Sequence, residues 1–483
     1  MLEYGYMAPA MFAGLIFFML FGFPVAFSLS ALGLFFGALA IEVGYFGPEF
    51  LQALPYRVFG IMSNDLLLAI PFFTFMGAIL EKSGLAEDLL DGFGQLFGPV
   101  PGGLAFAVNV VGAILGAITG TVAASVIAMG MITIPVMMRY GYDMRLGTGV
   151  IAASGTITQV IPPSLVLIVL ADQLGVSVGD MYLGAIGPSV LQVGLFVLFV
   201  LGVAIFQPWK VPALPPEART LHGRALLAKV LWGMVPSLVL IFLVLGTIFM
   251  GLATPTEAGA MGAVGAIVLA FLHGRYRNDL MWQAMTSTAR LTAMVIFILL
   301  GATVFSLVFQ GVNGGRWIEH LLGGLPGGRT GFLVFTMIFI FFIAFFLDFF
   351  EIAFIVVPML VPVAAALDIN LIWFGLLLCV NMQTSFMHPP FGFALFYLRG
   401  IAPPAIKTTD IYWGALPWIG LQLLLVAILI FWPESVTYWI GEHATLDPAA
   451  VERALEGLTL PDPTGDLGAP DFGAPPPPEL NLE

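Results

Sequence analysis

Two pairs of consecutive prolines constrain the fold of this chain more than any other feature. Pro162-Pro163 and Pro389-Pro390 lie 227 residues apart (389 − 162), and each pair follows a tract of small and amide side chains, SGTITQVI in the first case and NMQTSFMH in the second. Proline has no amide hydrogen and its ring clashes with the preceding turn, so a proline pair interrupts a helix. The sequence therefore predicts two broken helices at matching positions of two halves.

The composition places these helices in a membrane. Apolar residues make up 60% of the chain and charged residues only 9%, whereas soluble domains carry about 25% charge. Apolar segments long enough to cross about 30 Å of hydrocarbon recur along nearly the whole chain, which is typical of a carrier. The first residues lack the basic region and cleavage site of a secretory signal, so we expect the first span to be retained in a bacterial inner membrane.

The distribution of basic residues predicts the topology. Lysine and arginine accumulate on the cytoplasmic side of membrane proteins. If the chain starts outside, twelve basic residues fall inside and four outside, provided that 101–138 and 330–366 are re-entrant hairpins that enter and leave by one face. Each half then crosses five times. Because five is odd, the second half is inverted relative to the first, and both termini lie in the periplasm.

We therefore predict an all-α polytopic membrane protein built from two inverted repeats. Short matches outside the proline pairs support the repeat: GDMYLGA at 179–185 pairs with TDIYWGA at 409–415, and PGG at 101–103 pairs with PGG at 326–328. The predicted segments are a first repeat over 1–206 with its broken helix at 145–174, a cytoplasmic linker over 207–229, a second repeat over 230–435 with its broken helix at 371–401, and an acidic, disordered tail over 436–483.

The broken helices are where we expect ligands to bind. Unwound backbone at membrane depth is tolerated only where it faces protein or a polar cavity. Freed carbonyls suit a small cation, and exposed helix N-termini suit a carboxylate. The predicted sodium ligands are Thr119, Thr121, Ser125, Gly155, Thr158, Asp348, Glu351, Thr384 and Ser385. The predicted substrate-binding residues are Ser154, Thr156, Asn381, Gln383 and Arg399.

Each of these assignments has a plainer alternative. Small polar residues also serve as packing contacts between membrane helices. Asp348 and Glu351 stand isolated in FFIAFFLDFFEIAFIVV, where an ionised carboxylate is costly and therefore suggests function, but a peripheral or protonated acid is the alternative. A spacing of three puts both on one face if the tip is helical. Arg399 is equally suited to anchor the protein at the inner surface, and His388 either relays protons or binds a freed carbonyl.

Several functions are excluded or disfavoured by what the sequence lacks. It contains no G-x-x-x-x-G-K-[ST] motif, which excludes this route of ATP hydrolysis. One cysteine, Cys379, excludes an internal disulfide and a cysteine-rich metal centre. The motif ATPTEAG at 253–259 resembles a catalytic motif, but its threonine, proline and glutamate fit a capping box that opens a helix. We expect no enzyme activity, no cofactor beyond sodium as a coupling ion, and no nucleic-acid partner.

Seven motifs of this sequence match those of a known membrane protein family. They are FGFPVAF (21–27), GAITGTVAAS (116–125), SGTITQVIPPS (154–164), GDMYLGAIGPS (179–189), GLATPTEAGA (251–260), FLDFFEIAF (346–354) and HPPFGFALFYLRGIAP (388–403). At these residues the chain resembles the large membrane subunit of tripartite ATP-independent periplasmic (TRAP) transporters, within the ion transporter superfamily. The resemblance implies an elevator carrier with sodium near two hairpin tips, a small four-helix membrane subunit and a periplasmic binding protein as partners, and an organic anion such as a dicarboxylate as substrate. The alternative is a stand-alone anion/sodium symporter or efflux carrier.

Overall fold

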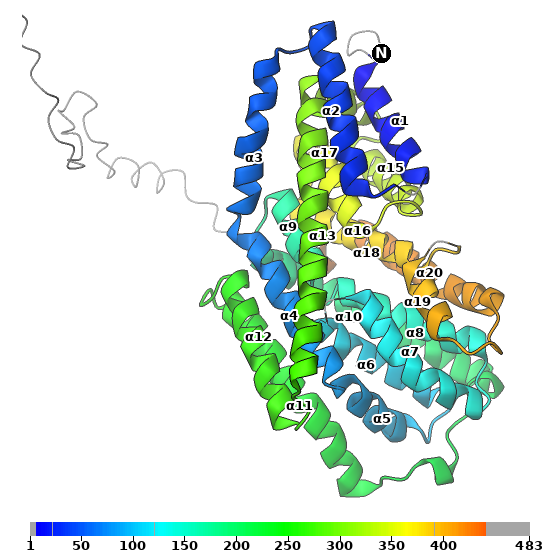
Figure 1. Cartoon of the computed structure of the whole chain (residues 1–483). Coiled ribbons are helices and arrows are strands. Elements are labelled where there is room, and N and C mark those ends of the chain that lie inside the picture. Colours follow the sequence, from blue (N-terminus) through cyan, green and yellow to red (C-terminus); the bar gives the residue numbers. More distant parts are fainter. Residues whose placement is uncertain (1–5, 22, 120, 391, 441–483) are drawn as a thin grey trace, which may run out of the picture. The chain divides into compact units, whose positions relative to one another are not determined.

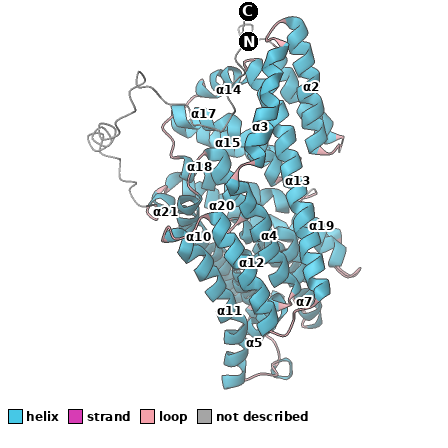
Figure 2. Ribbon diagram, turned by 60° about the vertical axis from the view of Figure 1, so that its left-hand side comes forward, coloured by secondary structure: helices cyan, strands magenta, loops and turns pink. Residues whose placement is uncertain are grey.

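The computed structural model describes residues 6–21, 23–119, 121–390 and 392–440, and over these residues all regular structure is helical (Figures 1 and 2). The predicted all-α fold is confirmed. Within this part of the chain, eight helices are long and apolar enough to cross a membrane, or up to ten if each of two bent helix pairs counts as one span. The compact helical body ends at Trp439.

The first repeat contains the helical hairpin and the broken helix that the sequence predicts. The hairpin consists of α6 and α7, and the helix interrupted at the first proline pair consists of α8, a short 3₁₀ turn (η3, Ile157–Gln159) and α9. The helices of this repeat are α1 (Met7–Leu20), α2 (Val25–Val43), α3 (Ala53–Met62), α4 (Ala69–Lys82), α5 (Leu85–Phe97), α6 (Gly103–Thr119), α7 (Val122–Arg139), α8 (Met144–Thr156), α9 (Leu165–Leu174) and α10 (Val178–Phe206).

The second repeat presents the same elements in the same order. Its hairpin is α15 followed by α16, a π-helical turn (η6, Ile352–Val356) and α17, and its broken helix is α18, a 3₁₀ turn (η7, Thr384–Met387) and α19. The helices are α11 (Gly223–Phe249), α12 (Pro255–Leu272), α13 (Asn278–Gly311), α14 (Gly314–Gly323), α15 (Gly328–Ile343), α16 (Phe349–Glu351), α17 (Val357–Ala366), α18 (Leu371–Gln383), α19 (Phe393–Ile401), α20 (Thr408–Phe431) and α21 (Glu434–Thr437).

Corresponding helices pack in a reciprocal pattern. Helix α2 packs on α13, and its counterpart α12 packs on α4, while α4 and α13 run side by side (Figure 1). Glycines make these contacts close: a Cβ added to Gly33 would lie 2.9 Å from Val304 Cγ1, and one added to Gly262 would lie 2.6 Å from Met76 Sδ. Each repeat therefore supplies one helix that the other repeat covers.

The same exchange joins the broken helices. Helix α20 packs on α8, and its counterpart α10 packs on α18. Gly184 and Gly414, which the sequence match aligns, lie at these two crossings. A Cβ on Gly414 would lie 2.1 Å from the carbonyl oxygen of Arg145, and one on Gly184 would lie 3.0 Å from Leu376 Cδ1. Thus α10 of the first repeat packs against the broken helix of the second, and α20 of the second repeat packs against the broken helix of the first. The predicted pair of inverted repeats accounts for this exchange.

Hydrogen bonds and an ion pair join the segment between the two repeats to the first hairpin and to α5, which precedes it. The Gly102 amide donates to the Val211 carbonyl and the Leu214 amide donates to the Gly98 carbonyl, both at 2.8 Å. Lys229 of α11 forms an ion pair with Asp91 of α5. Burial of the Asp91 carboxylate opposes ionisation, but hydrogen bonds from Lys229 and Gln95 outweigh it and lower its pKa.

The acidic tail predicted from residue 436 lies outside the described residues from 441 onward. Its first residues belong to the helical body, because Ser435 and Val436 of α21 are buried against α10. The capping box predicted at the start of α12 is confirmed: the Glu257 amide donates to Thr254 Oγ1 at 3.3 Å, and the Thr254 amide donates to Glu257 Oε2 at 2.8 Å.

Candidate functional site

A cavity of about 290 Å³ lies where the two hairpins and the two broken helices meet. Both hairpins contribute to its wall, since Thr121 belongs to the first and Asp348 to the second. The wall also contains both turns that precede the proline pairs, through Gln159 and Phe386. The remaining lining residues are Val122, Ala123, Leu165, Val166, Leu291, Met294, Phe349, Phe350, Phe393 and Tyr397.

Four helices begin at this cavity. The first residues of α7, α9, α16 and α19 all line it. Ser164 and Asp348 cap α9 and α16 with their side chains, whereas Thr121 and Gly392, which precede α7 and α19, make no side-chain cap. The N-terminus of a helix carries a partial positive charge and unpaired amide groups. Because the described lining contains no lysine, arginine or histidine, these termini supply the cavity's positive potential.

Asp348 and Glu351 bind each other's backbone at the tip of the second hairpin. The Glu351 amide donates to Asp348 Oδ1 at 3.0 Å, and the Asp348 amide donates to Glu351 Oε2 at 2.9 Å. Asp348 has an extended backbone and precedes the helix, so the two acids form a capping box rather than neighbours on one helix face. Asp348 also lines both the central cavity and an adjoining cavity of about 570 Å³, which Glu351 lines as well.

The remaining predicted residues of the first repeat are not among the described lining residues of the cavity, and two of their hydroxyls donate to backbone carbonyls. Thr156 Oγ1 donates to the Ala153 carbonyl at 2.8 Å, and Thr158 Oγ1 donates to the Gly155 carbonyl at 3.0 Å. Thr158 Oγ1, which donates its hydrogen in this way, keeps its lone pairs for a cation, whereas Thr156 Oγ1 also accepts a hydrogen bond from Gln422. In addition, Ser154 donates to Asn109 Oδ1 at 2.7 Å, Ser125 is fully buried, and the side chain of Thr119 lies outside the description.

The second-repeat residues follow the same pattern with one exception. Thr384 Oγ1 donates to the Asn381 carbonyl at 2.7 Å, and Ser385 Oγ donates to the Met382 carbonyl at 2.6 Å. Asn381 Nδ2 donates to the Met337 carbonyl of α15 at 2.7 Å, which ties the broken helix to its own hairpin. The exception is Arg399, which is exposed, donates to the Ile406 carbonyl at 2.8 Å and lies outside the cavity lining.

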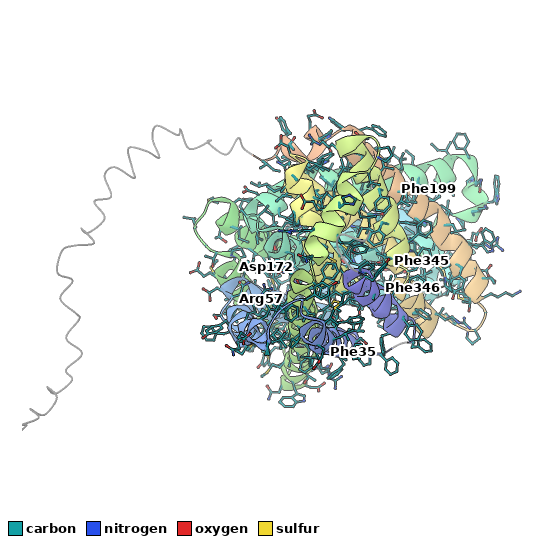
Figure 3. All side chains as sticks on the ribbon, turned by 90° about the horizontal axis from the view of Figure 1, so that it is seen from above. Phe35, Arg57, Asp172, Phe199, Phe345 and Phe346 are labelled. Atoms are coloured by element: carbon teal, nitrogen blue, oxygen red, sulfur yellow. The ribbon has the colours of Figure 1, made fainter. Side chains whose placement is uncertain are left out.

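His388 packs between aromatic rings of the second hairpin. Its ring centroid lies 4.2 Å from that of Phe345 and 4.3 Å from that of Phe341. Neither ring nitrogen has a hydrogen-bond partner among the described residues, and only 1% of the residue is exposed. Figure 3 looks along the helical body and labels Phe345 and the adjacent Phe346 at this tip. His388 therefore holds the hairpin tip against the broken helix through ring contacts.

Three glutamines that the sequence analysis did not single out belong to the site. Gln159 lines the cavity, is 2% exposed, and has no partner for its Oε1 among the described residues. Gln192 of α10 donates to Gln383 Oε1 at 2.6 Å, and Gln422 of α20 donates to Thr156 Oγ1 at 2.9 Å. Gln192 and Gln422 are both fully buried.

These two hydrogen bonds are related by the repeat. Gln192 and Gln422 lie 230 residues apart (422 − 192), the same offset as the aligned Gly184 and Gly414. Their acceptors, Thr156 and Gln383, lie 227 residues apart (383 − 156), the same offset as the two proline pairs. Extending the repeat alignment by eight residues beyond Gly184 would therefore have found the glutamine pair. In each repeat, one buried glutamine side chain binds the last residue before the 3₁₀ turn in the broken helix of the other repeat.

Replacing Gln192 with leucine is expected to lower the free energy of unfolding by about 1–3 kcal/mol, the cost of leaving a buried polar group without a partner. The variant would remove the hydrogen bond that Gln192 donates to Gln383 Oε1. Since Gln383 Nε2 has no partner among the described residues, the buried amide of Gln383 would be left without a described hydrogen bond. Gln422→Leu should cost less, since Thr156 Oγ1 keeps its bond to Ala153. Thermal unfolding of the purified protein measures both, and Gln283→Leu on exposed α13 surface is the control. Equal stability of Gln192→Leu and wild type would contradict the assignment.

Comparison with known proteins places this fold among membrane carriers. Residues 12–435 match the family profile described as "Tripartite ATP-independent periplasmic transporter, DctM component". A C4-dicarboxylate TRAP transporter large permease protein of Pseudomonas aeruginosa is 30% identical over 409 residues, which are 84% of this chain and 93% of that protein. An isethionate TRAP transporter permease protein of Oleidesulfovibrio alaskensis is 27% identical and covers 90% of this chain, with 66% of its own length covered.

A solved structure supports the fold. The YdaH transporter of Alcanivorax borkumensis superimposes with a TM-score of 0.58 at 18% identity, covering 81% of this chain and 88% of that one. The matched family and relatives are transporter permeases. The prediction of a carrier rather than an enzyme is therefore confirmed.

Proposed function

The chain belongs to the DctM family, the large membrane component of tripartite ATP-independent periplasmic transporters, and we propose that it imports a small organic anion by coupling to sodium. The observation that carries the proposal is the cavity on which the N-termini of α7, α9, α16 and α19 converge. Helix N-termini stabilise anions, and α7 and α19 leave theirs free of side-chain caps. A carboxylate fits this potential without a basic side chain.

Neutral oxygens near both hairpin tips support sodium as the coupling ion. Hydroxyls of Thr158 and Thr384 and the carbonyls that they bind are hard ligands of the kind that a small cation prefers. Asp348 adds a carboxylate at the second tip. We propose that the nine predicted ligands hold the sodium near the two hairpin tips, with Gln159 as a further oxygen at the cavity wall.

The arrangement of the helices suits an elevator mechanism. The hairpins, the broken helices, α10 and α20 pack into one unit around the cavity. A second set of helices, α4 and α13 with the helices α12 and α2 that cover them, would serve as the scaffold. In this proposal the first unit carries substrate and sodium past the scaffold, with both termini on the periplasmic side of the inner membrane.

Partners follow from the family. The matched family is one component of a tripartite periplasmic transporter. We therefore propose that this chain works with two partners, a small membrane subunit and a periplasmic binding protein that delivers the anion. The alternative, a symporter that needs no binding protein, predicts full uptake by the permease alone.

An inward sodium gradient is expected to drive uptake in vesicles that contain the permease and its two partners. The substrate would be the ligand that co-purifies with the binding protein. Protonophores should leave uptake unchanged, because the described cavity wall lacks basic proton-relay side chains. Full uptake driven by a pH gradient without sodium would contradict the coupling, and full uptake without the binding protein would contradict the partner assignment.

A further inference from the structure

The wall of the central cavity also indicates what kind of anion it binds. We propose that the substrate carries a single negative charge on a compact apolar or aromatic body, rather than two carboxylates. This inference rests on the proposed function, because it concerns the same site. It differs from the C4-dicarboxylates named for some relatives.

Charge is the first argument. Asp348 is the only charged residue among the described lining residues, and no lysine, arginine or histidine accompanies it. A sodium ion at Asp348 would neutralise that carboxylate but leave no positive side chain for a second substrate carboxylate. The N-termini of α7 and α19, which have no side-chain cap, are positioned for one anionic group, and the described lining offers no arginine to bind a second carboxylate in a bidentate pair.

The distribution of polar and apolar side chains is the second argument. The uncharged polar groups of the first repeat, Thr121 and Gln159, lie on the wall with the N-terminus of α7. The second repeat contributes five aromatic side chains, which form a largely apolar wall. Their rings are close enough to act together, with centroids 6.0 Å apart for Phe386 and Phe393 and 5.0 Å apart for Phe349 and Phe350. The five are Phe349, Phe350, Phe386, Phe393 and Tyr397.

These rings are positioned to contact an apolar body. Aromatic pairs favour edge-to-face or offset contacts at centroid separations of about 4.5–7 Å, so a substrate ring can join the existing pairs. The volume of about 290 Å³ lies at the lower end of the range for small-molecule sites, which limits the body to about one ring. Leu165 and Val166 of α9 and Leu291 and Met294 of α13 complete the apolar surface.

The inference can be tested by ligand binding to the complex of permease and small subunit in lipid nanodiscs. The probes are phenylacetate, succinate and benzyl alcohol, each with and without sodium, and the readout is isothermal titration calorimetry. We expect phenylacetate to bind at least about tenfold more tightly than succinate, which corresponds to about 1.4 kcal/mol. Benzyl alcohol, which keeps the ring and lacks the charge, should not bind.

A matched pair of variants on α19 localises the effect. The two rings are similarly exposed, Phe393 by 45% and Phe396, three residues later on the same helix, by 52%, but only Phe393 is among the described residues that line the cavity. Phe393→Ala should weaken phenylacetate binding about tenfold, and Phe396→Ala should leave it unchanged, because only the first removes a ring from the wall. Tighter sodium-dependent binding of succinate than of phenylacetate would overturn this inference and leave the proposed function intact. Absence of sodium-dependent binding by both acids would also overturn this inference, whereas the proposed function is overturned only if a sodium gradient fails to drive uptake of the ligand that co-purifies with the binding protein.

Discussion

The Asp348→Asn variant is expected to lose sodium-driven uptake while it folds and assembles as the wild type does. Asparagine keeps an oxygen that can accept the Glu351 amide, so the capping box at the hairpin tip is retained. It removes the only charge among the lining residues that the structure describes. Loss of a few kcal/mol of cation binding weakens sodium affinity by orders of magnitude, at about 1.4 kcal/mol per tenfold. Uptake as a function of sodium concentration measures the effect.

The second capping box of the chain provides the control for this experiment. Thr254 and Glu257 form the same structure at the start of α12, and neither lines the central cavity. Glu257→Gln should therefore leave uptake and its sodium dependence unchanged. Asp348→Ala removes both the charge and the cap, and should also lower stability by about 1 kcal/mol. If Asp348→Asn transports with wild-type sodium dependence, Asp348 has only the capping role.

The sequence predicts the architecture well where helices are apolar or broken by proline. The two proline pairs locate both broken helices because the physical effect of proline on a helix depends on local geometry alone. The short helices α5 and α14, which occupy the same position in the two repeats, are not predicted from apolar segments or proline pairs. Both are amphipathic rather than uniformly apolar, so a search for membrane-length apolar segments passes over them.

The candidate site is predicted less completely, and the reasons are specific. Asp348 and Glu351 are three residues apart, as are Thr254 and Glu257. From the sequence this spacing predicts a shared helix face for the first pair and a capping box for the second, but both pairs form capping boxes. Whether such a pair forms a capping box depends on where the helix begins, and the uniformly apolar sequence around Asp348 does not predict that position. Most of the predicted hydroxyls and amides are not among the described lining residues of the cavity, and hydroxyls such as those of Thr158 and Thr384 donate to backbone carbonyls instead.

The contribution of α10 and α20 depends on tertiary structure. Gln192 and Gln422 lie in long apolar helices, 191 and 266 residues from the side chains that they bind, so local patterns give no sign of their role. Their meaning comes from the exchange of last helices between the repeats. That exchange depends on the inversion of the second half, which is the central claim for this protein.

Cysteine labelling in intact spheroplasts tests the inversion most directly. Cys379 is fully buried and can be replaced by alanine to remove background reactivity. The reporters are Val100→Cys and Thr330→Cys, both at exposed positions beside the first arm of a hairpin. If the hairpins open toward opposite faces, an impermeant thiol reagent added from the periplasmic side labels Thr330→Cys and spares Val100→Cys, and both react after the membrane is permeabilised. Equal labelling of both positions in intact spheroplasts would contradict the inverted arrangement and the shared cavity that depends on it.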